Sequence, residues 1–172
     1  MGLTPLDGLM MGTRSGSIDP GILFHLARSK NLSIEQIEEA LLKESGLLGI
    51  SGKSADMRQV IELANANDDR AQLAIDIYCM RVQQAIGALA TNMGGIDAVV
   101  FTAGVGENSA FIRKQIIAPL SFLGLELDAN LIQSCKTDKD ISSKDAKTKT
   151  LIIAAREELQ MANEIESLLK SL

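Results

Sequence analysis

The stretch Val99-Val100-Phe101-Thr102-Ala103-Gly104-Val105-Gly106-Glu107-Asn108-Ser109 decides the fold class of this sequence. An apolar run ends in small residues and two glycines, and an amphipathic segment begins at the Asn and Ser. This order predicts a strand, a glycine-rich turn and the start of a helix. Glycines let a ligand approach the backbone, and the first N–H groups of a helix are unpaired donors. Two interpretations remain open here: contact with a nucleotide, or a plain strand-to-helix connection.

The segments around this stretch predict few strands. The continuous apolar run of residues 96–103 favours a strand buried on both faces, as in the centre of a parallel sheet. Residues 150–154 predict a second strand. Residues 109–120 predict a helix that stops near Pro119, and short extended pieces are expected around residues 123–127.

The C-terminal third of the sequence predicts exposed segments and a final helix. Residues 136–150 are mostly Lys, Asp, Ser and Thr, a composition typical of a solvated loop or an exposed hairpin. Residues 156–172 predict an amphipathic helix. Its expected inner side carries Leu159, Ile165, Leu168 and Leu169.

The first half of the sequence predicts helices with clear start and stop signals. Residues 1–17 indicate an ordered but irregular segment. The predicted helices then begin at Asp19-Pro20, with Asp as N-cap and Pro at the first helical position, at the capping box of Ser33–Gln36, at Asp56, and at Asp68 or Asp69. Gly46 ends the second of these helices, residues 49–55 predict a loop of small residues, and Gly94-Gly95 ends the longest helix.

Length and organisation favour one incomplete α/β domain. A chain of 172 residues is long enough for a single domain with a substantial core, and no repeat or linker is visible. Two strong strands among six helices form an unusually small sheet. We therefore expect part of a helix-rich α/β domain whose remaining strands lie elsewhere.

Composition excludes several classes of function. The chain has 17 basic and 22 acidic residues and a net charge of −5, with no basic run interleaved with aromatic residues, so nucleic-acid binding is not expected. No segment has the length of a membrane span. Cys79 and Cys135 lie far apart and His25 is the single histidine, which argues against a zinc site and a disulfide framework. We expect a soluble cytoplasmic protein with reduced, buried thiols.

Three blocks of the sequence resemble the acetate kinase family. The segment Met1-Gly2-Leu3-Thr4-Pro5-Leu6-Asp7-Gly8-Leu9-Met10-Met11-Gly12-Thr13-Arg14-Ser15-Gly16-Ser17-Ile18-Asp19-Pro20 is close to that family's signature. Residues 101–109 resemble its adenosine-binding turn, and Glu157-Glu158-Leu159 resembles the acidic motif after its last strand. The resemblance covers essentially the whole chain, in the right order.

The resemblance implies a fold and a reaction. Residues 1–172 would be part of the C-terminal nucleotide-binding domain, an incomplete ribonuclease H-like (actin-like ATPase) fold, and the N-terminal domain would be absent. The family's enzymes transfer phosphate from ATP to acetate with Mg²⁺, giving ADP and acetyl phosphate. The partners so implied are these substrates and either a second copy of the chain or the missing N-terminal half.

The resemblance assigns roles to residues in the first half of the chain. Arg14 matches an arginine that contacts the carboxylate and stabilises the transferring phosphoryl group; without the family, it reads as a solvated loop arginine. Asp56, Met57 and Arg58 match the segment that lies against adenine and ribose. The family usually has Phe at the middle position, and Asp56 also reads as an ordinary helix N-cap.

It also assigns roles in the second half. Gly104, Val105, Gly106, Glu107 and Asn108 match the nucleotide turn, and Ala103 stands where the family usually has a further Gly. Glu157 matches a magnesium-linked carboxylate; the alternative is an ordinary glutamate of a first helical turn. The family tends toward Pro-Thr-Asn before this glutamate, whereas this chain has Ala154-Ala155-Arg156, and Arg156 is expected to compete for Glu157. His25 lies outside the family's catalytic motif and is interpreted as structural.

The expected activity follows from what this chain contains. Half of a cleft cannot orient both reactants, so we expect the isolated chain to be inactive. Two alternatives remain open: a non-enzymatic fragment for dimerisation or interaction, and a propionate kinase, because most of the acceptor pocket would lie outside this chain.

Overall fold

The computed structural model describes residues 2–133 and 137–171, which leaves Met1 and Cys135 outside the described residues. It divides into two compact units, Met1–Gly94 and Gly95–Leu172. The sequence led us to expect one domain without an internal boundary. The division falls at the glycine pair that ends the longest helix.

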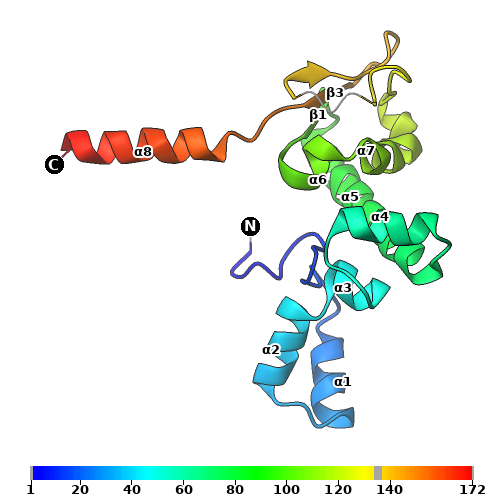
Figure 1. The fold of residues 1–172 in the computed structure, drawn as a ribbon, viewed down its shortest axis with the longest axis vertical. Helices are drawn as coiled ribbons and strands as arrows, with labels where there is room; N and C mark the ends of the chain where they lie inside the picture. Colours follow the sequence, from blue (N-terminus) through cyan, green and yellow to red (C-terminus); the bar gives the residue numbers. More distant parts are fainter. Residues whose placement is uncertain (1, 134–136, 172) are drawn as a thin grey trace. The chain divides into compact units, whose positions relative to one another are not determined.

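The first unit consists of helices (Figure 1). They are α1 (Gly21–Ser29), α2 (Ile34–Lys43), α3 (Gly46–Ser51), α4 (Met57–Asn65) and α5 (Asp69–Met93). Their starts confirm the capping signals. The hydroxyl of Ser33 accepts from Gln36 N–H while the Gln36 side chain accepts from Ser33 N–H, and Asp68 caps α5. Gly94 ends α5 with a φ of +72°, a conformation that glycine adopts at little cost.

Three boundaries in this unit differ from the sequence prediction. Gly46 does not end the second helix, because α2 already ends at Lys43 and Gly46 is the first residue of α3. Helix α1 begins at Gly21 rather than at Pro20, although Asp19 Oδ1 accepts from Gly21 N–H at 2.8 Å and so serves the expected capping role. Residues 49–51 belong to α3 instead of a loop. The first N–H groups of α3 bond to a distant segment, from Leu47 to Met11 O at 3.0 Å and from Leu48 to Gly12 O at 2.9 Å, a partnership that local sequence does not reveal.

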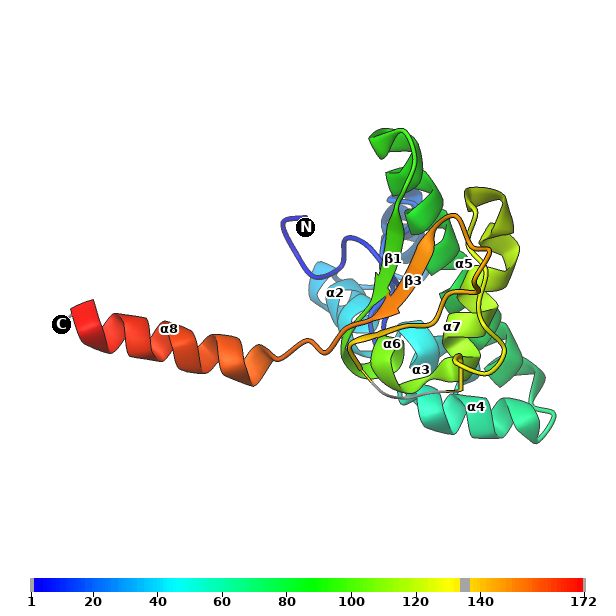
Figure 2. The same ribbon diagram turned by 90° about the horizontal axis from the view of Figure 1, so that it is seen from above.

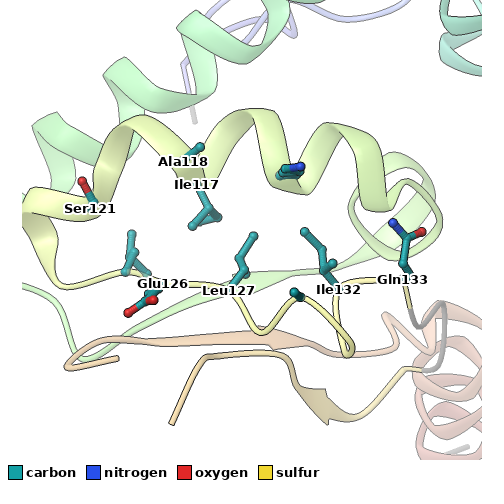
Figure 3. A pocket seen from close by; sticks show the side chains of 10 residues that line it. Ile117, Ala118, Ser121, Glu126, Leu127, Ile132 and Gln133 are labelled. Carbon is teal, nitrogen blue, oxygen red and sulfur yellow. The ribbon is translucent and has the colours of Figure 1, made fainter. Parts of the chain in front are cut away.

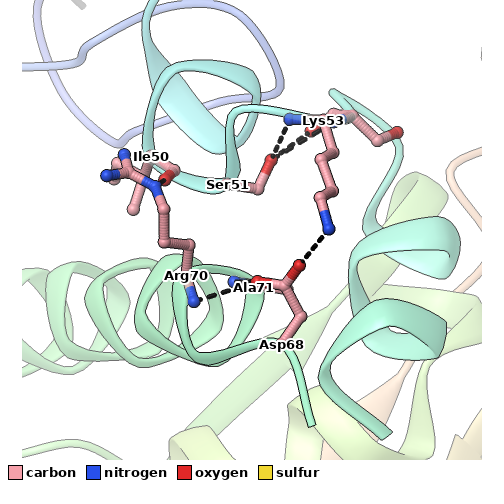
Figure 4. A network of polar contacts seen from close by, with 7 residues as sticks. Ile50, Ser51, Lys53, Asp68, Arg70 and Ala71 are labelled. Atoms are coloured by element: carbon pink, nitrogen blue, oxygen red, sulfur yellow. Dashed lines mark hydrogen bonds and ion pairs between the residues drawn. The ribbon is translucent and has the colours of Figure 1, made fainter. Parts of the chain in front are cut away.

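Helices α3 and α5 are joined by polar contacts around Asp68 (Figure 4). Asp68 Oδ2 accepts from Lys53 Nζ at 2.5 Å, and its Oδ1 accepts from the N–H groups of Arg70 and Ala71. Arg70 Nε donates to Ile50 O at 2.8 Å. Because of the Lys53 bond, the pKa of Asp68 lies below its usual value. The N-cap of α5 thus also fixes the end of α3.

The second unit contains a three-stranded sheet of order β1-β3-β2. Strands β1 (Ala98–Phe101) and β3 (Lys149–Ile152) are parallel and lie side by side (Figure 2), and β2 (Lys139–Asp140) pairs antiparallel with β3. Between β1 and β2 the chain forms α6 (Ala103–Asn108), α7 (Ala110–Ile117) and the 3-10 helix η1 (Ala118–Leu123); α8 (Glu157–Ser171) follows β3. The helix-rich α/β class with a parallel strand pair is confirmed, with a small mixed sheet.

Burial in the second unit corrects three expectations. Strand β1 is not buried on both faces, since Val100 is 51% exposed and β1 pairs with β3 alone among the described strands. The expected exposed hairpin carries Ile141 at 0% exposure, because Ile141 N–H donates to Thr150 O and joins the sheet. Every side chain of α8 from Glu157 to Lys170 is exposed, so the side of this helix that was expected to face inward is not buried.

Two further properties of the described residues bear on the expectations drawn from composition. Cys79 is a free, buried thiol, and burial raises its pKa to about 11. No helix in the described part of the chain is long and apolar enough to cross a membrane.

Candidate functional site

The carboxyl ends of β1 and β3 meet at one edge of the sheet. The last residue pair is Phe101 with Ile152, and Ile153 N–H donates to Phe101 O at 2.9 Å. The chain then continues into α6 on one side and toward α8 on the other. Ligands of open α/β sheets bind outside the carboxyl ends of parallel strands, so this edge is the first place to look for a site.

A hollow of about 450 Å³ lies at this edge. It is lined by the two segments that leave the strands: Ala103, Gly104, Glu107, Ala154, Ala155, Arg156, Glu157 and Glu158. The structure therefore brings together Gly104, Glu107 and Glu157, which the sequence placed in one site although about fifty residues of chain separate them.

Glu107 holds the two segments against each other. Its Oε1 accepts from Ala103 N–H at 2.6 Å and from Ala155 N–H at 2.9 Å. Hydrogen bonds to an ionised acceptor are roughly twice as strong as those between neutral groups. The carboxylate is thus engaged by the backbone and positions the walls of the hollow.

The predicted glycine-rich turn is a short helix. Residues Gly104, Val105, Gly106, Glu107 and Asn108 all belong to α6, and Asn108 Nδ2 donates to Gly104 O at 2.8 Å. A Cβ on Gly104 would meet no atom within 4 Å, whereas one on Gly106 would lie 3.5 Å from the carbonyl carbon of Phe101. Gly104 therefore leaves the backbone open, whereas a Cβ on Gly106 would make an ordinary van der Waals contact with the end of β1.

Both segments contain a non-glycine residue in the left-handed region. Ala103 has a φ of +56° and Arg156 a φ of +48°. A Cβ in this conformation crowds the neighbouring carbonyl and costs roughly 1–2 kcal/mol. Gly and Asn tolerate it best, and these are the residue types that the resembling family has at the two positions.

Arg113 is a site-supporting residue that the sequence analysis missed. It is fully buried; its Nη1 donates to Gly106 O at 2.9 Å and to Glu107 O at 2.8 Å, and its Nη2 donates to Ile132 O at 3.2 Å. A cation at the carboxyl end of a helix is favourable. The sequence feature that could have predicted its burial is its position beside Ile112, Ile116 and Ile117, on the apolar side of a predicted helix.

Arg156 pairs with Asp138 instead of competing for Glu157. Its Nη1 lies 3.1 Å from Asp138 Oδ1, and its Nη2 bonds to the other carboxylate oxygen. This hydrogen bonding lowers the pKa of Asp138. The expected competition is therefore wrong in this structure, and Glu157 keeps its carboxylate exposed at the hollow.

The carboxylates at the hollow suit a metal ion that takes few of its ligands from the protein. No group of three or more His, Cys, Asp or Glu that suits a metal occurs among residues 2–133 and 137–171. Mg²⁺ normally takes one or two protein carboxylates and completes its shell with water and phosphate oxygens. Glu157 supplies one such carboxylate, so the donor set fits Mg²⁺ delivered with a nucleotide phosphate.

Arg14 and residues 56–58, which the sequence also predicts as site residues, belong to the first unit. Arg14 is half-buried, and its backbone O accepts from Met11 N–H at 3.1 Å. Gly46 faces this segment so closely that a Cβ there would lie 2.1 Å from Met11 O. The start of α3 thus fixes the loop that carries Arg14. In the described chain, its guanidinium contacts the thioether of Met11 at 3.8 Å and forms no ion pair.

The Asp56-Met57-Arg58 segment forms the start of α4. Asp56 Oδ1 accepts from Arg58 N–H at 2.8 Å and its Oδ2 from Arg58 Nη2 at 2.6 Å, which lowers the pKa of Asp56 to about 2. Met57 is only 5% exposed. Its thioether therefore has little surface for a purine, so any ligand contact of this segment falls to Asp56 and Arg58. His25 is exposed on α1, with Nδ1 3.3 Å from Ser29 Oγ.

The chain is similar to known acetate kinases. The model of the acetokinase family matches residues 1–163. An acetate kinase of Acetivibrio thermocellus is 47% identical over 172 residues, all of this chain and 43% of that protein, and one of Nostoc punctiforme is 49% identical over 171 residues, 99% of this chain and 42% of that protein. The chain thus spans less than half the length of these relatives.

Solved structures give the same result. The crystal structure of Porphyromonas gingivalis acetate kinase matches with a TM-score of 0.90 at 37% identity, over 98% of this chain and 43% of that one. A propionate kinase from Francisella tularensis matches with a TM-score of 0.88 at 44% identity, over 95% of this chain and 42% of that one. With matching residues along almost its whole length, the chain belongs to the acetokinase family.

Proposed function

We propose that this chain is the nucleotide-binding part of a carboxylate kinase with an incomplete ribonuclease H-like (actin-like ATPase) fold. Gly104, Val105, Gly106 and Asn108 contact ATP or ADP, and Glu107 positions their backbone. The hollow at the ends of β1 and β3 carries this proposal, because α6 and the segment before α8 face each other there. The actin-like assignment follows from the family resemblance, and the parallel strand pair with its helical crossover is compatible with it.

The proposed reaction transfers the γ-phosphoryl group of ATP to acetate. A carboxylate oxygen attacks the γ-phosphorus, the bond to the β-phosphate oxygen breaks, and acetyl phosphate and ADP leave. Glu157 would hold the Mg²⁺ that accompanies the nucleotide, and the chemistry this ion would supply is neutralisation of charge on the phosphates. Arg14 stabilises the transferring phosphoryl group, and Asp56 and Arg58 contact the adenosine. The proposed location of the protein is the cytoplasm.

A second acceptor is favoured by one comparison. The Francisella tularensis propionate kinase matches this chain as well as the acetate kinases do, so propionate is the alternative acceptor. The chain pairs either with a second copy of itself or with a separate N-terminal half. The isolated 172-residue chain binds nucleotide and is inactive, since it spans 43% of the first relative.

Isothermal titration of the chain with ADP and Mg²⁺ tests nucleotide binding. Gly104→Leu places a side chain into the hollow, because nothing lies within 4 Å of its Cβ position, and it is expected to abolish binding without lowering the melting temperature. Gly87→Leu on α5 is the matched control, with equally open space, and binds ADP normally. Absence of saturable binding by the wild-type chain, or equal binding by Gly104→Leu, contradicts the proposal.

A further inference from the structure

A second hollow in the Gly95–Leu172 unit shares no lining residue with the first. It has a volume of about 320 Å³ and lies between the α7–η1 segment and residues 125–133 (Figure 3). This volume falls within the range of small-molecule sites. The proposed function makes no use of it.

The two walls of this pocket give it an apolar middle. Lys114, Ile117, Ala118 and Ser121 line one wall, and their spacing of i, i+3, i+4 and i+7 places them on one side of the helical segment. Ile117 is 1% exposed. Figure 3 shows Ile117, Leu127 and Ile132 pointing into the space between the walls. An apolar ligand segment would there be removed from water.

One cation and one anion, Lys114 and Glu126, line the pocket. Ser121 and Glu126 lie at one end in Figure 3, and Gln133 lies at the other. Lys114 belongs to α7 and lies on the same wall of the pocket as Ser121. Within residues 2–133 and 137–171, neither Lys114 nor Glu126 takes part in an ion pair. A cation and an anion thus line the same apolar pocket without forming an ion pair with each other.

Arg113 links this pocket to α6. Its Nη2 donates to the carbonyl of Ile132, a residue of the pocket wall, while its Nη1 donates to the carbonyls of Gly106 and Glu107. The guanidinium is fully buried and has a fixed fork of donors, so a shift of Ile132 changes the bonds that Arg113 makes to α6.

We propose that this pocket binds a linear zwitterion with an apolar middle, and that Arg113 transmits its occupancy to α6. The ligand carboxylate lies at Lys114, its ammonium group lies at Glu126, and its apolar part packs on Ile117 and Ile132. An ω-amino carboxylate and a short apolar peptide with free termini share this chemistry. The binding does not depend on the proposed nucleotide site.

The test is a titration of the ¹⁵N-labelled chain followed by two-dimensional NMR, with 8-aminooctanoate and the peptide Ala-Leu-Ala as separate probes. Octanoate and octylamine each lack one charge and serve as comparisons. We expect saturable shifts of Ala118 and Ile132 with at least one zwitterion, and affinities about threefold lower for each singly charged analogue, as expected for exposed ion pairs. The amide chemical shifts of Gly106 and Glu107 are expected to follow the same saturation curve as those of Ala118 and Ile132.

Variants with matched controls locate the ligand. Lys114→Gln and Glu126→Gln should each weaken zwitterion binding about threefold, whereas the exposed control variants Lys144→Gln and Glu38→Gln leave it unchanged. Ala118→Phe fills the pocket from an exposed position and abolishes binding while the melting temperature is kept.

Three outcomes overturn the proposal. Equal binding of octanoate, octylamine and both zwitterions would mean that the pocket does not recognise charge. Binding that survives Ala118→Phe would place the ligand elsewhere. Saturable shifts of the pocket residues without shifts of Gly106 and Glu107 would disprove the coupling through Arg113.

Discussion

The carboxylate of Glu107 accepts a hydrogen bond from the backbone N–H of Ala155, 48 residues further along the chain. The same oxygen accepts from Ala103 N–H. One side chain therefore joins the segments that leave two neighbouring parallel strands. This contact defines the candidate site more directly than the glycines that first suggested it, because it brings the α6 segment and the α8 segment to one hollow.

Removing this contact should open the hollow. Glu107→Ala leaves two backbone N–H groups without their acceptor and is expected to cost about 2 kcal/mol of stability, with Glu107→Gln losing roughly half as much because an amide oxygen still accepts. Hydrogen exchange at the amides of Ala103 and Ala155 measures the effect. Glu158→Ala, an exposed residue of the same hollow, is the control and should leave both amides protected.

Ala103 is a site where glycine should stabilise the chain. Its φ of +56° costs roughly 1–2 kcal/mol, and glycine removes this cost while losing roughly 0.5–1 kcal/mol of chain entropy. Ala103→Gly is therefore expected to raise the free energy of unfolding by about 0.5 kcal/mol. Ala118→Gly is the control of opposite sign, since Ala118 has an ordinary helical φ of −53°. Urea unfolding measures the free energy of unfolding of both variants. A lower value for Ala103→Gly than for the wild-type chain would contradict the strain argument.

Arg113 should be far more important to stability than its exposed counterparts. Arg113→Met leaves the carbonyls of Gly106, Glu107 and Ile132 without this donor, and the loss is expected to be about 3 kcal/mol. The measurement is hydrogen exchange, which should become faster at the amides of α6 and α7 in Arg113→Met. Arg28→Met changes an exposed arginine of α1 in the same way and should leave the exchange of α6 and α7 unaltered. Equal effects of the two variants would refute a special role.

The Asp56–Arg58 pair predicts a specific acid response. The pKa of Asp56 falls from 3.8 to about 2 in the folded chain, mainly through its hydrogen bonds to Arg58. Because the folded pKa is the lower one, the stabilisation is complete above pH 3.8 and is lost as the pH falls through about 2. The wild-type chain should therefore lose more stability between pH 4 and pH 2 than Asp56→Asn does. Melting temperatures across this range measure the difference, and Arg58→Gln should resemble Asp56→Asn.

The start and end signals of the helices could be predicted because they act within a few residues. The capping box of Ser33, the N-cap at Asp68 and the left-handed Gly94 all bond to groups in their own turn of the chain. The parallel β1–β3 pair could be expected as well, since both strands are short apolar runs bounded by turn residues.

The site residues were predicted more by family resemblance than by pattern, and the structure changed how several of them are interpreted. Glu107 is occupied by backbone donors, Met57 is buried, and Arg156 pairs with Asp138. None of these relationships is visible in the sequence, because each depends on a partner or an environment supplied by a distant segment.

By itself, the sequence determined the longer helices, the two strands that pair in parallel and which family the chain resembles, because caps, periodicity and glycine conformations are local properties. Only the tertiary structure decided that residues 49–51 are helical, that Val100 is exposed, and that Arg113 supports α6. The physical reason is that burial and hydrogen-bond satisfaction depend on all neighbours in space, and these neighbours lie tens of residues away along the chain.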